Sequence, residues 1–213
     1  LFGLGLLLAL LSLRERRLYR DFLCPGYVFF AAACLYFLLL LKGQVFNSYD
    51  NFSHWALVVK QMLLTDRFPT FRDPIILFQA YPLGSSVFVY YVSKLISTVS
   101  EGCQMFAQTT LTLSMILPLF SCVKKQKLSG ILLVLGSALF FLSYNIKPVD
   151  LLVDTLLALT GAAALLLLTQ ELADECETTW LSALPAIALV LIKNSGIFFW
   201  ALLAGKLLVH GFR

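Results

Sequence analysis

The amino-acid sequence predicts an all-α fold, a polytopic bundle of transmembrane helices, and three observations support that prediction. Hydrophobic residues make up 60% of the 213 residues and charged residues only 13%, whereas soluble domains average roughly 25% charged residues. The hydrophobic residues form runs close to the ~20 residues that a helix needs to cross a bilayer. Short clusters of Lys and Arg separate several of these runs, as is typical of cytoplasmic loops.

We treat residues 1–213 as one transmembrane domain and expect it to be a fragment, because the chain begins and ends in apolar runs. Residues 1–13 are predicted to be the tail of one span, and the basic stretch 14–20 is predicted to be cytoplasmic. The net charge of +4 is modest, which argues against nucleic acid as a partner. The five cysteines show no spacing typical of a disulfide framework or a metal site. Complete spans are expected at 22–41, 103–123, 128–144, 150–169, 180–192 and 197–209.

The first long connection, residues 43–99, is predicted to be an external loop that contains helices lying along the membrane surface. Lys124, Lys125 and Lys127 follow a span and should be cytoplasmic. If the segment 85–99 crossed the membrane fully, these lysines would be outside, so we expect 85–99 to lie flat in the outer leaflet. Long ordered loops are usually functional, which makes this loop the first place to look for a site.

Residues 50–65 are expected to form one amphipathic helix within this loop. At about 100° per residue, one narrow sector of the helix is polar and the opposite face is apolar. Trp55, on the apolar face, is expected at the level of the lipid headgroups. The alternatives are that Asp50 caps the helix and that His54 is a plain interfacial residue. The residues of the polar sector are Asp50, His54, Gln61 and Thr65.

Three charged residues at the ends of later spans are further candidates. Asp150 and Asp154 are one turn apart, and a charge as deep in the hydrocarbon as Asp154 costs roughly 2.5–3.5 kcal/mol. Lys193 follows an apolar run, and its compact ammonium suits a lipid-linked phosphate. The alternatives are that Asp150 caps a helix and that Lys193 extends to the outer headgroups. All three are expected on the same side of the membrane as Asp50.

The order of these features resembles the GT-C superfamily of membrane glycosyltransferases, most closely its branch of protein O-mannosyltransferases and lipid A aminoarabinose transferases. In that branch a span leads to an external loop that opens with Asp-Glu and an amphipathic helix. Here the loop opens with Asp50-Asn51, so Asn51 stands where the family usually has Glu. Tyr81 precedes Pro82 at a position where some relatives carry Lys or His. The later features of the pattern are matched by Lys124, Lys125, Lys127, Asp150, Lys193 and Gly196.

The resemblance implies a multi-pass protein of the plasma (inner) membrane with its site on the extracytoplasmic side. It would move a sugar, with inversion, from a polyprenyl-phosphate donor to an acceptor that is a glycan, a lipid or a protein. Asp50 would be the general base. Some members of the superfamily hold a divalent cation, for which Asp50 and Asp150 are candidates here, although no metal ligand is assigned. The residues implied to bind substrate are Asn51, His54, Arg67, Arg72, Tyr81, Asp150 and Lys193.

Two other functions stay open on the sequence alone. A transporter or flippase for a lipid-linked saccharide would use Asp154 and Lys193 as polar sites near the membrane midplane. In a non-catalytic membrane scaffold, Asp50, Asp150 and Lys193 would point to unrelated surfaces.

Overall fold

The computed structural model describes residues 25–73, 75–121, 131–133, 135–137, 139, 150–173 and 180–212, which form helices, turns and irregular segments but no strands. The all-α prediction is therefore confirmed for the described part of the chain. The predictions for residues 1–21, for the lysines at 124–127 and for most of the span 128–144 lie outside it.

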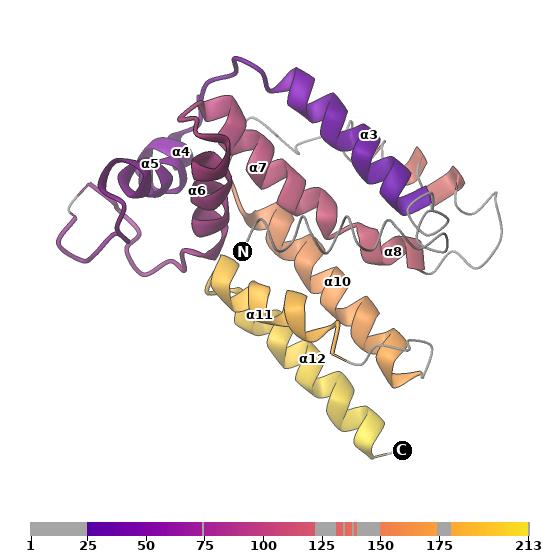
Figure 1. Ribbon diagram of the computed structural model, residues 1–213. Helices are drawn as coiled ribbons and strands as arrows, with labels where there is room; N and C mark the ends of the chain where they lie inside the picture. Colours follow the sequence, from indigo (N-terminus) through magenta and orange to yellow (C-terminus); the bar gives the residue numbers. More distant parts are fainter. Residues whose placement is uncertain are drawn as a thin grey trace.

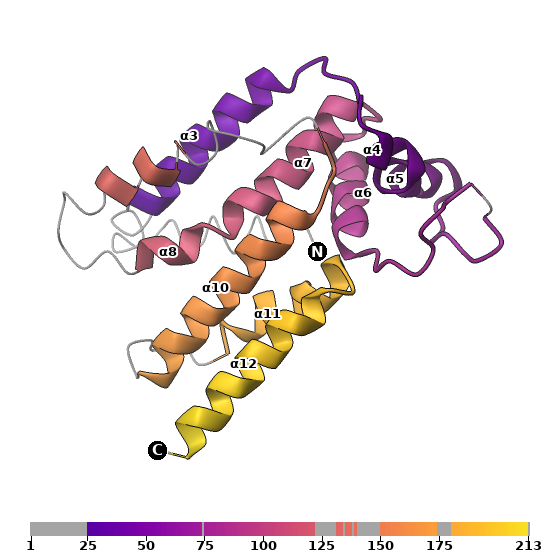
Figure 2. The ribbon, with the colours of Figure 1, turned by 180° about the vertical axis from the view of Figure 1, so that it is seen from behind.

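Four helices run side by side along the length of the molecule (Figures 1 and 2). Contacts link the first to the second, the second to the third and the third to the fourth. The short helix α8 (Leu117–Ser121) continues the second of them, and α11 (Ala183–Ile192) packs against the last two. The four are α3 (Pro25–Leu40), α7 (Glu101–Ser114), α10 (Asp154–Leu172) and α12 (Gly196–Gly211).

Three further helices gather at one end of this bundle (Figure 1). They are α4 (Tyr49–Ser53), α5 (Trp55–Thr65) and α6 (Gly84–Ile96). Helix α5 packs on α6, which in turn packs on α7 and α11. The helical segment expected at 85–99 therefore exists as α6, and the irregular connection 66–83 joins it to α5.

Two helical segments of the described residues, 101–121 and 154–172, are long and apolar enough to cross a membrane. The first of them comprises α7 and α8, which are separated by a tight turn at residues 115 and 116. Pro118 explains this break, because its ring would collide with the carbonyl of Ser114 in a continuous helix. Helices α3, α11 and α12 are apolar but shorter.

The start of α10 differs from the predicted span. The sequence predicts that the helix includes Asp150, whereas α10 begins at Asp154 and residues 151–153 are irregular. These residues are held in place by a distant side chain, described below. The predicted break at 193–196 is present between α11 and α12, where residues 194 and 195 form a turn.

The hydrophobic core lies where α5, α7, α10 and α11 meet, around Val59, Met105, Leu156 and Leu189, all of which are fully buried. Two glycines allow close approach between helices. A Cβ on Gly102 of α7 would collide with the backbone oxygen of Leu41, at the end of α3, and one on Gly161 of α10 would collide with the ring of Phe199 on α12.

Candidate functional site

The predicted helix at 50–65 is broken at His54. The backbone of His54 is not helical, with φ −148° and ψ −73°, so α4 ends at Ser53 and α5 begins at Trp55. The prediction of one continuous polar sector is therefore wrong. Asp50 is half-buried, whereas the His54 side chain is turned inward and is 1% exposed.

His54 lies in a cluster of aromatic rings. Its ring meets those of Trp55, Phe78 and Tyr81 edge-on, with centroid distances of 4.6, 6.0 and 5.3 Å. Tyr81 also stacks on Trp55 at 5.7 Å and on Phe78 at 5.3 Å. Trp55 is 4% exposed, so it packs within the protein and is not free to lie among lipid headgroups as expected.

Burial keeps His54 neutral. Neither ring nitrogen has a hydrogen-bond partner, and desolvation lowers the pKa of His54 below its usual 6.5. His54 and Tyr81 therefore join the connection 66–83 to α5 through ring packing. The structure gives His54 no polar contact through which it could act on a substrate from its present position.

Asn51 links α4 to the segment that precedes α10. Its side-chain oxygen accepts a 3.0 Å hydrogen bond from the backbone N–H of Leu151, one hundred residues away in the chain. The carbonyl of Leu151 accepts a further bond from Gln108 of α7, at 3.5 Å. Asn51 is fully buried, and its amide nitrogen has no partner. The residue expected to contact substrate thus has a structural contact that holds 150–153 against α4.

An acidic residue immediately precedes each of the two bonded residues: Asp50 comes before Asn51, and Asp150 comes before Leu151. Neither acts as an N-cap, since those positions belong to Ser48 in α4 and to Val153 in α10. One carboxylate oxygen of Asp150 is buried without a partner, and no hydrogen bond or ion pair of the described residues involves the Asp50 side chain. The other described acidic residues all have partners: Asp66, Asp73, Glu101, Asp154 and Glu171.

Lys193 lies at the same end of the bundle and forms an ion pair. Its ammonium is 2.6 Å from a carboxylate oxygen of Asp154, at the first turn of α10. The next residue, Asn194, donates a 3.2 Å hydrogen bond to the backbone oxygen of Ala80, which precedes Tyr81. The turn between α11 and α12 therefore contacts the connection that also covers His54. The Lys193 side chain is 23% exposed, and Asp154 is its partner.

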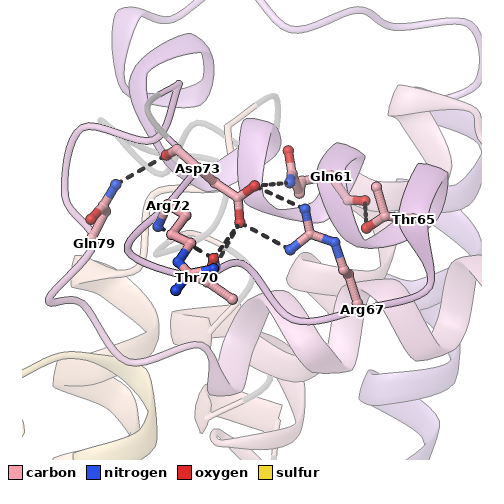
Figure 3. A network of polar contacts seen from close by, with 7 residues as sticks. All are labelled: Gln61, Thr65, Arg67, Thr70, Arg72, Asp73 and Gln79. Carbon is pink, nitrogen blue, oxygen red and sulfur yellow. Dashed lines mark hydrogen bonds and ion pairs between the residues drawn. The ribbon is translucent and has the colours of Figure 1, made fainter.

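Arg67 and Arg72 lie in the connection 66–83 (Figure 3). The guanidinium of Arg67 is 3.0 Å from Asp73, which also accepts bonds from Gln61 and from the backbone of Thr70. These contacts, the one to Arg67 above all, lower the pKa of Asp73 to about 2. The guanidinium of Arg72 instead lies 5.6 Å from the centroid of the Phe71 ring. The structure thus pairs Arg67 with an acid and leaves Arg72 on an aromatic ring.

A small pocket of about 170 Å³ adjoins α4, at the start of α7. A cavity of about this size can hold a six-membered ring. Glu101 accepts a 2.6 Å hydrogen bond from the backbone N–H of Phe46 at its wall, and the side-chain oxygen of Gln104 is buried there without a partner. The sequence does not single out Glu101 and Gln104, because polar residues near the start of a span are ordinary, or Lys60, because a lysine within a long loop is ordinary. The lining residues are Phe46, Asn51, Phe52, Ala56, Leu57, Lys60, Val99, Glu101 and Gln104.

The described residues contain no group of three or more His, Cys, Asp or Glu side chains that could hold a metal ion. Asp50 and Asp150 would supply two carboxylates, and a divalent cation held by them would take its other oxygen ligands from water or from a substrate phosphate. Comparison of the chain with protein-family models, with curated proteins and with solved structures finds no match.

Proposed function

We propose that this chain is part of a polytopic membrane glycosyltransferase that moves a sugar from a polyprenyl-phosphate donor to an acceptor outside the cytoplasm. The observation that carries the proposal is the free carboxylate of Asp50. A general base must come within hydrogen-bond reach of the proton that it takes. Asp50 is half-buried and no described residue pairs with its side chain, so its carboxylate is open to an acceptor hydroxyl.

In this proposal Asp50 takes the proton of the acceptor hydroxyl. The hydroxyl oxygen forms a bond to the anomeric carbon of the sugar while the bond from that carbon to the donor phosphate breaks, and the polyprenyl phosphate leaves with the electron pair. Attack from the face opposite the phosphate inverts the anomeric carbon. Negative charge grows on the phosphate as it leaves, so a fixed cation near it lowers the barrier.

Lys193 is the proposed cation for that phosphate. It lies at the same end of the bundle as α4, since the turn 193–195 contacts the connection 66–83. Asp154 holds the Lys193 ammonium in position, and the donor phosphate would have to take its place as the partner. No step of the proposal uses a metal.

The same contacts favour the enzyme over the two alternatives. A transporter would use Asp154 and Lys193 near the midplane, but Asp154 is the first residue of α10 and Lys193 directly follows α11. A scaffold would leave Asp50, Asp150 and Lys193 on unrelated surfaces, whereas all three lie near contacts that join α4, α10 and α11 at one end of the bundle.

The test is the variant Asp50→Asn, which keeps the shape of the side chain and removes its basicity. Sugar transfer should fall by about 10²–10⁴-fold, the usual contribution of a positioned base. The assay would follow label from polyprenyl-phosphate mannose and from polyprenyl-phosphate aminoarabinose into membrane acceptors. Asp66→Asn is the matched control, because Asp66 is an exposed acid paired with Lys94, and transfer should persist in it. Equal transfer by both variants would refute the assignment of Asp50.

A further inference from the structure

The connection 66–83 exposes large apolar side chains. The most exposed of them is Phe71, whose relative exposure is 79%. Exposed apolar groups that gather in one short segment can mark a site of contact with a membrane or a partner. The large apolar residues exposed between its ends are Phe68, Phe71, Ile75, Leu77 and Phe78.

A polar network holds this connection in shape (Figure 3). Besides its bonds to Arg67, Gln61 and Thr70, Asp73 accepts a 3.0 Å hydrogen bond through its backbone oxygen from the Gln79 side chain. The backbone N–H of Leu77 donates to the carbonyl of Ser53 in α4 at 3.3 Å. The apolar side chains therefore point outward from a fixed scaffold, whose own polar groups are largely satisfied.

The charges of the connection leave one cation unmatched at its apolar tip. Asp73 matches Arg67, and Asp66, at the start of the connection, is 2.5 Å from Lys94. Arg72 has no acidic partner among the described residues, and its guanidinium lies against the exposed ring of Phe71. An aromatic and aliphatic surface with an added cation is the combination found in segments that enter the interface of anionic membranes.

The position of the connection indicates a bilayer as its partner. It is fastened to α4 through Ser53, and α4 is fastened through Asn51 to the segment before α10. Asp66, the first residue of the connection, is 2.5 Å from Lys94 near the end of α6, and the segment 101–121 begins five residues after α6 ends. Both segments of membrane-spanning length thus begin near it, which keeps the connection close to the depth at which a bilayer would end.

We propose that the tip of the connection 66–83 inserts into the lipid interface at this end of the bundle, with Phe68, Phe71 and Ile75 among the upper acyl chains and Arg72 on anionic lipid phosphates. The insertion would fix the height of α4 relative to the membrane surface. This proposal requires that 101–121 and 154–172 span the membrane, but it does not depend on sugar transfer.

The test uses the full chain, with Phe71→Trp, reconstituted in vesicles of brominated phosphatidylcholine that contain phosphatidylglycerol. Brominated chains quench tryptophan only when it lies within the bilayer. The unsubstituted protein supplies the background from Trp55, Trp180 and Trp200. We expect extra quenching from Phe71→Trp, strongest with bromine near the headgroups, together with protection from acrylamide in the water. Phe68→Trp provides a second reporter at the same tip.

Two outcomes would overturn the proposal. Quenching by acrylamide and not by brominated lipid would mean that the tip is in water, and quenching by neither would mean that protein covers it.

Adding Asp73→Asn to Phe71→Trp should reduce the lipid quenching, because it loosens the network that presents the tip. With Arg72 in place, quenching of Phe71→Trp by brominated lipid should be stronger in vesicles that contain phosphatidylglycerol than in vesicles that lack it. Adding Arg72→Gln should abolish this difference in quenching, whereas adding Arg72→Lys should preserve it. Equal behaviour of these two variants would refute the role of Arg72.

Discussion

At the scale of single residues, His54 is buried and neither of its ring nitrogens has a hydrogen-bond partner. Its polar ring occupies a position that a phenylalanine ring could fill. The imidazole occupies an aromatic cluster in which Trp55, Phe78 and Tyr81 surround it. A proton on the ring would add a charge with no partner inside this cluster, which costs several kcal/mol unless the structure opens. The packing of the connection 66–83 on α5 should therefore depend on pH.

We predict that the protein loses thermal stability as the pH falls through about 6.5, and that His54→Phe removes most of this loss. Because burial lowers the pKa of His54 in the folded protein, the unfolded chain binds a proton in that range that the folded chain does not, so acid favours unfolding. The measurement is the melting temperature of the reconstituted protein between about pH 8 and pH 5.

His210→Phe is the control for this prediction, because His210 is the other histidine of the chain and is exposed near the end of α12. His54→Phe should change the pH dependence of the melting temperature more than His210→Phe does. If His54→Phe loses as much melting temperature on acidification as the unsubstituted protein does, another group is responsible.

The sequence identified many of the polar residues that the structure brings together, but it assigned them the wrong contacts. The link from Asn51 to Leu151 joins residues one hundred positions apart. Two of the aromatic rings that pack against His54 belong to Phe78 and Tyr81, which lie more than twenty positions away in the chain. Periodicity within one helix contains no information about such partners. For this reason helical periodicity puts His54 on a polar face, whereas the structure has its side chain buried.

At the scale of secondary-structure elements, the close contact of α3 with α7 depends on Gly102. The end of α3 directs the backbone oxygen of Leu41 at the position where a Cβ of residue 102 would be. Backbone atoms cannot move aside as a flexible side chain can, so a larger residue would force the two helices apart.

We predict that Gly102→Ala destabilises the protein by about 1–3 kcal/mol, the usual cost of overpacking. Gly205→Ala in α12 is the matched control, since nothing lies within 4 Å of a Cβ there, and a helical Gly→Ala change in open space is neutral or favourable. Both variants would be compared by denaturation in SDS of the protein in mixed micelles. If the two variants are equally stable, moving α3 away from α7 to make room for the Cβ of residue 102 does not lower the free energy of unfolding.

The elements themselves followed from the sequence better than their ends did. Runs of apolar residues predict helices because only a helix satisfies its own backbone in lipid, and the described runs are helical. The break before Pro118 and the late start of α10 were missed. The break depends on the ring of Pro118, and the late start of α10 depends on the hydrogen bond from Leu151 to Asn51.

At the scale of the whole molecule, α10, α11 and α12 are tied together at both ends. Lys193 and Asp154 join the start of α10 to the turn before α12. At the other end, the hydroxyl of Ser182 and the carboxylate of Glu171 join α10 to the start of α11, and Lys206 of α12 donates to Thr169. Helix α11 therefore connects the two ends of α10, and α12 returns beside it (Figure 2).

This register predicts the topology of the chain in a membrane. Residues at the level of α4 and of the turn 193–195 should lie on one side of the bilayer, and the end of α12 on the other. Lys60 and His210 are both exposed and represent the two ends. In a protein with its five cysteines replaced, Lys60→Cys should react with an impermeant thiol reagent added outside sealed right-side-out vesicles. His210→Cys should react only after permeabilisation, because the reagent cannot cross the bilayer to reach it. If both cysteines label from the outside, α10 and α12 do not cross the membrane, and the proposed site would then lose the lipid-linked donor on which its chemistry depends.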